Sequence, residues 1–145
     1  MFTSVTSRAA SAYQRVATET SVQGADPHHL VGLLFDGLLQ AIATARGGLA
    51  RQDVAAKGVA IGKAVRILEE GLKAGLNMRD GGEVAANLRN LYDYSIVRLT
   101  HANLRNDEEA LAEVARLIEP VADSWKQIKG ARPAPSVQPA AGLGA

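Results

Sequence analysis

The chain has 145 residues and a mass of 15.2 kDa, a size that suits one domain with one hydrophobic core. Hydrophobic residues make up 47% of the chain and charged residues 21%, which is typical of a soluble globular protein and too apolar for a wholly disordered one. The lack of cysteine excludes a disulfide scaffold, a zinc finger and a thiol nucleophile, and a net charge of +1 argues against nucleic acid as a partner. Charged residues or glycines interrupt every apolar run, so we expect no stable membrane insertion.

Residues 1–25 predict an N-terminal arm with at most a short helix. Serine and threonine are frequent there, and Arg8 and Arg15 are the only charged side chains before Glu19. This composition also suits an organellar transit peptide. Short termini rich in serine and threonine are most often uncleaved and loosely ordered, and we favour that interpretation.

Four amphipathic segments follow, with apolar residues three or four positions apart. Asp26 and Pro27 predict the start of the first helix, because aspartate caps free amide groups and proline suits the first helical position. Asp53 is expected to cap the second helix after a short polar connection. Asn106 is expected to cap the fourth helix, and Asp107, Glu108 and Glu109 place three negative charges at the positive end of its dipole. The third helix is expected after the glycine-rich segment 77–82.

The predicted fold is all-α, an antiparallel four-helix bundle over residues 26–129, because the connections are short and no segment alternates like a strand. The apolar stripe of the fourth helix contains Trp125, and Pro120 falls within the same helix. Proline has no amide hydrogen to donate to the Arg116 carbonyl, so we expect a kink there. Residues 130–145, rich in alanine, proline and glycine, predict a disordered C-terminal tail.

The second helix carries a further stripe of mostly small residues beside its main apolar face. One interpretation is that a central helix buries more of its circumference; the other is a docking surface on which a partner helix lies close. Glycines within the predicted helices also have two explanations: they let helices pack closely inside the bundle, or they form a shallow groove for another chain. The third helix adds Tyr94 and Val97 outside its main stripe, and such aromatic residues are favoured at interfaces. The small-residue stripe comprises Ala60, Ala64, Ile67, Gly71 and Ala74.

Patterns for catalysis or metal binding are weak. His28 and His29 are adjacent and point in different directions on a helix, and no Glu-x-x-His motif is present. Gly81-Gly82 lacks the spacing and the preceding strand of a phosphate-binding loop. We therefore expect no cofactor, no metal and no enzymatic activity. A helical regulatory module is the alternative, although it would need a basic helix face, and a cofactor-binding bundle would lack ligands.

Six short motifs occur in order along residues 10–129: Ala12-Tyr13, Asp26-Pro27-His28-His29-Leu30, Leu34-Phe35-Asp36-Gly37, Gly81-Gly82-Glu83-Val84-Ala85-Ala86-Asn87-Leu88, Leu91-Tyr92-Asp93-Tyr94 and Ala102-Asn103-Leu104-Arg105-Asn106-Asp107. The Gly-Gly-Glu segment followed by Leu-Tyr-Asp-Tyr is the most specific combination. With these motifs the chain resembles the FliS family of flagellin export chaperones. Phe35 stands where the family often has tyrosine.

The resemblance implies a helical bundle that binds the C-terminal segment of new flagellin in the bacterial cytoplasm. It also implies that the chaperone prevents early polymerisation and delivers flagellin to the flagellar type III export apparatus. In this interpretation Tyr13 covers the flagellin-binding groove, and the free protein is a monomer or a weak homodimer. The candidate flagellin-binding residues are Tyr13, Ala60, Ala64, Ile67, Gly71, Ala74, Tyr94 and Val97.

Overall fold

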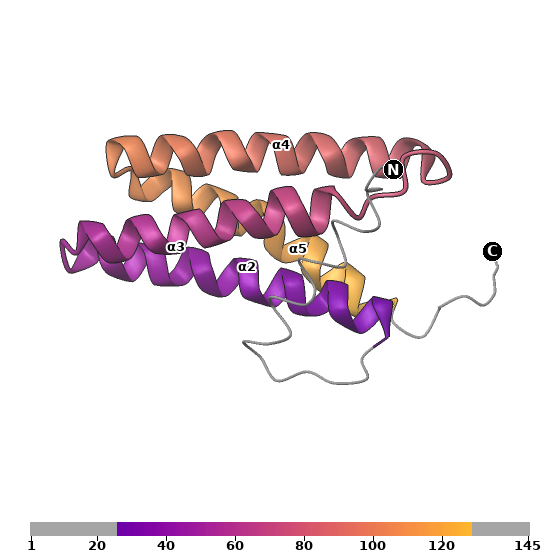
Figure 1. The fold of residues 1–145 in the computed structure, drawn as a ribbon, viewed down its shortest axis with the longest axis horizontal. Coiled ribbons are helices and arrows are strands. Elements are labelled where there is room, and N and C mark those ends of the chain that lie inside the picture. Colours follow the sequence, from indigo (N-terminus) through magenta and orange to yellow (C-terminus); the bar gives the residue numbers. More distant parts are fainter. Residues whose placement is uncertain (1–25, 129–145) are drawn as a thin grey trace, which may run out of the picture.

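The computed structural model describes residues 26–128, which form an antiparallel bundle of four long helices with no strand in that range (Figure 1). This confirms the predicted all-α fold. The expected arm, including Tyr13, and the expected tail at 130–145 lie outside the described residues. The helices are α2 (Pro27–Ala50), α3 (Val54–Arg66), α4 (Gly82–Arg105) and α5 (Glu108–Gln127), and a π-helical segment, η1 (Ile67–Lys73), continues α3.

Asp26 and Asp53 cap α2 and α3 as predicted, whereas the cap of α5 is Asp107 and not Asn106, which ends α4 in the left-handed conformation. The carboxylate of Asp26 accepts a hydrogen bond from the His29 amide at 2.7 Å, and Pro27 occupies the first turn of α2. Asp53 caps α3 at 3.0 Å from the Ala56 amide, and Asp107 caps α5 at 3.2 Å from the Ala110 amide. Each cap satisfies an amide that lacks a partner within its helix.

The second helix differs from the prediction, because its regular α-helical bonding ends at Arg66 and seven π-helical residues follow. In a π turn each amide bonds to the carbonyl five residues back, so the turn is wider than in an α-helix. Ile67, Leu68 and Leu72 are nevertheless all buried. The same spacing fits an ordinary α-helix, so periodicity alone does not reveal the change.

Side chains from all four helices form one hydrophobic core. Its largest fully buried members include Leu34, Leu38 and Ile42 from α2, and α2 contacts α3, η1 and α5. Removing each such side chain from water contributes about 1.5–3 kcal/mol to folding. The core also includes Phe35 of α2, Leu68 of η1, Leu99 of α4, and Leu111 and Ile118 of α5.

By length and composition alone α2 is apolar enough to cross a membrane, since an 18-residue window within it has a mean hydropathy of 1.2. This is contrary to the sequence expectation that no segment would qualify. The core helix of a soluble protein meets the same criterion. In the bundle, the apolar side chains Leu34, Leu38 and Ile42 pack against the other helices. Packing within the protein therefore accounts for the apolarity of this face of α2.

Two glycines have a clear structural reason. A Cβ at Gly48 would lie 3.0 Å from the Lys57 amide nitrogen and 3.2 Å from the Asp53 carbonyl, so the glycine lets the start of α3 approach α2 closely. Gly82 begins α4 with a φ of 58°, which L side chains rarely adopt. Gly62 differs from both, since its Cβ would meet no atom within 4 Å.

α5 continues through Pro120 to Gln127. Pro120 is exposed, and the helix beyond it carries Trp125 back to the bundle, where this side chain packs against the core. The proline therefore does not end the last helix.

Candidate partner-binding surface

The small-residue stripe predicted on the second helix lies inside the bundle. Ala64 is fully buried, and Ala60, Ile67 and Ala74 are at most 6% exposed. Gly71 is also buried. These residues present no open docking surface in this arrangement, because α3 and η1 contact both α2 and α4. The burial supports the other interpretation, that a central helix buries more of its circumference.

The sequence-predicted residues of the third helix, by contrast, face outward. Tyr94 and Val97 on α4 are 45% and 64% exposed, and Leu104 is 76% exposed. Positions three and seven residues apart lie on one side of a helix, so these three side chains form a single row, here named the α4 outer stripe. The sequence reasoning missed Leu104, although its place seven residues after Val97 signals the same side.

One exposed apolar side chain on α3 extends this surface. Val59 is 76% exposed, and Gly62 leaves open space beside it on the helix. The helices α3 and α4 approach each other at Gly58, where an added Cβ would lie 3.8 Å from the Asn103 side-chain oxygen. Val59 and Leu104 therefore lie at the same end of the bundle. We name Val59, Gly62 and the α4 outer stripe together the candidate partner-binding surface.

The Lys57 side chain on α3 forms a hydrogen bond to the end of α4. It is one of the two polar side chains buried in the part of the chain that the structure describes, and its Nζ donates a hydrogen bond to the Asn103 carbonyl at 2.8 Å. Asn103 lies in the last turn of α4, where free carbonyls favour a nearby positive charge. The lysine thereby holds the two helices that carry the candidate partner-binding surface in a defined relative position.

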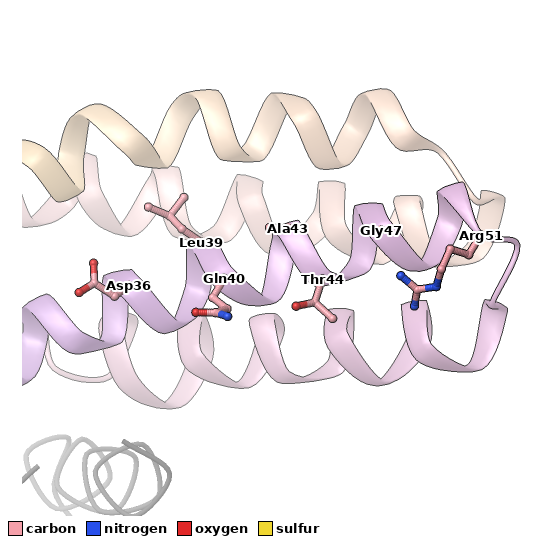
Figure 2. A pocket seen from close by; sticks show the side chains of 7 residues that line it. All are labelled: Asp36, Leu39, Gln40, Ala43, Thr44, Gly47 and Arg51. Carbon is pink, nitrogen blue, oxygen red and sulfur yellow. The ribbon is translucent and has the colours of Figure 1, made fainter. Parts of the chain in front are cut away.

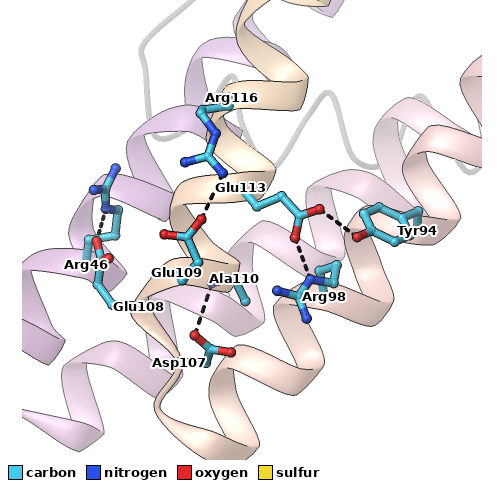
Figure 3. Close-up of polar contacts among 9 residues, drawn as sticks. All are labelled: Arg46, Tyr94, Arg98, Asp107, Glu108, Glu109, Ala110, Glu113 and Arg116. Carbon is cyan, nitrogen blue, oxygen red and sulfur yellow. Dashed lines mark hydrogen bonds and ion pairs between the residues drawn. The ribbon is translucent and has the colours of Figure 1, made fainter.

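Glu113 on α5 fixes the other edge of this surface (Figure 3). Its carboxylate accepts hydrogen bonds from the Tyr94 hydroxyl at 2.6 Å and from Arg98 Nε at 2.7 Å. These two hydrogen bonds lower the pKa of Glu113 below its ordinary value of 4.5, and the bond to Glu113 raises the pKa of Tyr94. The Tyr94 ring is thus held in place while much of it stays exposed.

This network predicts a pH dependence with a definite sign. The pKa of Glu113 is lower in the folded than in the unfolded state, so its stabilising effect is present above pH 4.5 and is lost as the pH falls through the lower folded pKa. We expect Glu113→Gln to lower the melting temperature slightly at neutral pH and to have no effect in strong acid. Thermal melts followed by circular dichroism check this, with Glu119→Gln as control. An equal effect at every pH would contradict it.

The two histidines predicted near the start of the first helix do not assemble a reactive site. His28 stacks on Trp125 with ring centroids 4.7 Å apart, and its Nε2 donates to the Trp125 carbonyl at 2.8 Å. The Trp125 indole in turn donates to the His28 carbonyl at 2.9 Å. The ring stack and the two hydrogen bonds, together named the His28–Trp125 clamp, join the start of α2 to the end of α5. Among residues 26–128, no three histidine, aspartate or glutamate side chains are grouped to hold a metal ion.

A known protein family matches the chain over every helix of the bundle. The family model described as "Flagellar protein FliS" matches residues 9–132, which include every helix of the bundle. The chain belongs to the FliS family. The FliS resemblance noted in the sequence motifs is thus confirmed.

Curated FliS relatives cover most of the chain. The chain is 51% identical over 117 residues to the flagellar secretion chaperone FliS of Salmonella typhimurium. The aligned segment covers 81% of this chain and 87% of that protein. The chain is 43% identical over 121 residues to the flagellar secretion chaperone FliSB of Pseudomonas aeruginosa, 83% of this chain and 95% of that protein. The FliS of Bacillus subtilis, also a flagellar secretion chaperone, is 35% identical over 117 residues, 81% of this chain and 83% of that protein.

Proposed function

We propose that this protein is a flagellar secretion chaperone that binds the C-terminal segment of flagellin in the bacterial cytoplasm. In this role it keeps flagellin from polymerising early and delivers it to the flagellar type III export apparatus. The observation that carries the proposal is the FliS match over the whole bundle, together with relatives that are named flagellar secretion chaperones. The exposed apolar surface on α3 and α4 supports it, because a chaperone of this kind works by surface complementarity.

The binding energy in this proposal comes from apolar burial. An amphipathic client segment that lies along the α4 outer stripe covers Val97 and Leu104, and each fully buried side chain of this size contributes about 1.5–3 kcal/mol. Ordering a client segment that is unfolded when free costs several kcal/mol of that gain. The net affinity is therefore moderate, and binding needs no ATP. Release then follows from transfer to the export apparatus.

The predicted contact residues have different roles in this proposal. Tyr94 and Val97 contact the client directly, since both are exposed. The family resemblance assigns Tyr13 to a lid over the client groove, and that assignment remains part of the proposal. The small-residue stripe supports binding indirectly, because its buried residues set the position of α3 and do not contact the client.

The test is client binding by surface variants. We expect Val97→Glu and Leu104→Glu each to weaken binding of a flagellin C-terminal fragment at least tenfold, because the complex would desolvate the new charge. Their thermal melts should match that of the original chain, since both positions are exposed. Isothermal titration calorimetry measures the affinity.

Gln40→Glu is the matched control, because Gln40 is exposed on α2, a different helix. It should bind the fragment with unchanged affinity. If the two α4 variants also bind unchanged, the candidate partner-binding surface is wrong. If the original chain does not bind the fragment at all, the proposed client itself is wrong.

A further inference from the structure

An open cavity of about 370 Å³ lies where the start of α2 meets the end of α5. One face of the Trp125 ring is covered by His28, with the ring centroids 4.7 Å apart. The indole is nevertheless only partly buried, and it forms part of the cavity wall. We name this space the α2–α5 cavity; its lining includes His29, Gly32, Leu33 and Asp36 of α2 and Trp125 and Lys126 of α5.

Four polar side chains around the α2–α5 cavity already have partners in the protein. His28 and Trp125 each donate a hydrogen bond to the backbone carbonyl of the other. Lys126 donates to Asp36 at 2.7 Å, so these two opposite charges balance. A charged ligand would have to compete with this ion pair, whereas an uncharged one can pack on the exposed part of the indole and on Leu33. The cavity therefore favours an apolar, uncharged segment.

The segment that follows α5 has this chemistry. The described chain ends at Ile128, three residues after Trp125, and the sequence continues through residues 129–145. Residues 133–145 contain no charged side chain, and Pro133 and Pro135 lie among them. Extended segments rich in proline bind in grooves lined by aromatic residues. Proline also has no backbone amide hydrogen, so it leaves no donor unpaired when it packs against a ring.

We propose that residues 133–137 of this chain dock in the α2–α5 cavity, with Pro133 and Pro135 packed against the Trp125 indole and Leu33. Apolar contact holds the segment, and Asp36 stays paired with Lys126. This occupant is favoured over a separate molecule because the chain itself leaves the bundle at the edge of the cavity.

The connection is long enough to reach every part of the cavity. An extended chain advances about 3.1 Å per residue, so the seven residues from Lys126 to Pro133 span up to about 22 Å. His29 and Asp36, at the two ends of the α2 wall, are about 10 Å apart along the helix. Gly130 lies within the connection, and glycine readily adopts the backbone conformations of a tight turn.

The covalent connection makes weak docking sufficient. Two proline rings bury little apolar area, so a free peptide of this sequence should bind only at about millimolar concentration or above. A short connection supplies an effective concentration in the millimolar range, which lets the attached segment occupy the cavity for much of the time. The α2–α5 cavity shares no residue with the candidate partner-binding surface, so this proposal does not rest on the proposed function.

Trp125 is the sole tryptophan, so its fluorescence reports directly on the cavity. We expect a protein that ends at Ala131 to show an acrylamide quenching constant about twofold higher than the full-length chain, because the docked segment no longer shields the ring. A protein that lacks only residues 140–145 is the control and should match the full-length chain. If ending the chain at Ala131 leaves the quenching constant unchanged, the proposal is wrong.

Proline substitution tests the contact in the full-length protein. Changing Pro133→Ser and Pro135→Ser together should raise the quenching constant nearly as far as the truncation does. Pro139→Ser lies outside the proposed segment and should have no effect. Circular dichroism confirms that each variant is folded. A double variant that is quenched like the original chain would overturn the proposal, and so would a quenching constant that changes with protein concentration, which would assign the cavity to a second copy.

Disulfide formation tests the position of the segment. The chain contains no cysteine, so His29→Cys combined with Ala134→Cys introduces a single pair of thiols. This pair should close within one molecule at least ten times faster than Thr44→Cys combined with Ala134→Cys. Thr44 is exposed in a larger open groove of about 690 Å³ farther along α2, which is lined by α2 alone and has no aromatic residue (Figure 2). Equal rates for the two pairs would contradict docking in the α2–α5 cavity.

Discussion

Ala64→Glu is expected to unfold the bundle rather than merely to weaken partner binding. Ala64 is fully buried in the core, and its neighbours there are apolar. A glutamate at this position must either bury an unpaired charge or open the helix packing, and each costs several kcal/mol. Total stabilities of such domains are about 5–15 kcal/mol, so most of the folded population would be lost. Far-ultraviolet circular dichroism and urea titration measure the loss.

Gly62→Glu is the matched control, two residues earlier on the same helix. A Cβ at this position would meet no atom within 4 Å, so the variant should keep its fold and its melting temperature. It should instead weaken flagellin binding, because Gly62 belongs to the candidate partner-binding surface. If Ala64→Glu were as stable as Gly62→Glu and lost client binding, the stripe would be a docking surface and the packing described here would be wrong.

Trp125→Ala is expected to destabilise the protein by about 2–4 kcal/mol, slightly less than the truncation of a fully buried aromatic residue, because the indole is only partly buried. The change removes the stack on His28 and the indole hydrogen bond to the His28 carbonyl. It also removes packing against Phe35, whose ring centroid lies 6.5 Å away. Urea unfolding followed by circular dichroism gives the difference in free energy.

Two further measurements separate the parts of this clamp. Trp125→Phe keeps an aromatic ring and loses the indole donor, so it should cost about 1 kcal/mol, the usual value of one hydrogen bond. As the sole tryptophan, Trp125 should emit at shorter wavelength in the folded than in the urea-unfolded protein. Identical emission in both states would show that the end of α5 is not packed as described.

Contacts between helices fix their relative positions, and these positions determine the shape of the candidate partner-binding surface. Lys57 holds α3 to the end of α4, and Glu113 holds α5 to Tyr94 and Arg98. The apolar side chains between these points remain exposed. A pre-arranged surface reduces the ordering that binding requires, so in the proposed complex most of the entropic cost falls on the partner.

Local sequence signals predict the fold class and, for α2 and α3, the capping residue at which the helix begins. Helix caps at Asp26, Asp53 and Asp107 are local signals, since each aspartate bonds to an amide only three residues ahead. Apolar periodicity is also local, and it identified most of the core stripe of each helix, although Val84 and Ile128, which fit the same spacing, are exposed. The same pattern identified Tyr94 and Val97 as surplus apolar residues, which are exposed.

Which of the surplus apolar residues are buried depends on the packing of the helices against one another and does not follow from the sequence pattern. Ala64 and Val97 both lie outside a main stripe, yet α3 has neighbours on two sides while the outer side of α4 has none among the described helices. The clamp between His28 and Trp125 joins residues 97 positions apart, and no local pattern encodes it. Burial depends on what packs against a surface, which is a property of the assembled bundle and not of any one helix.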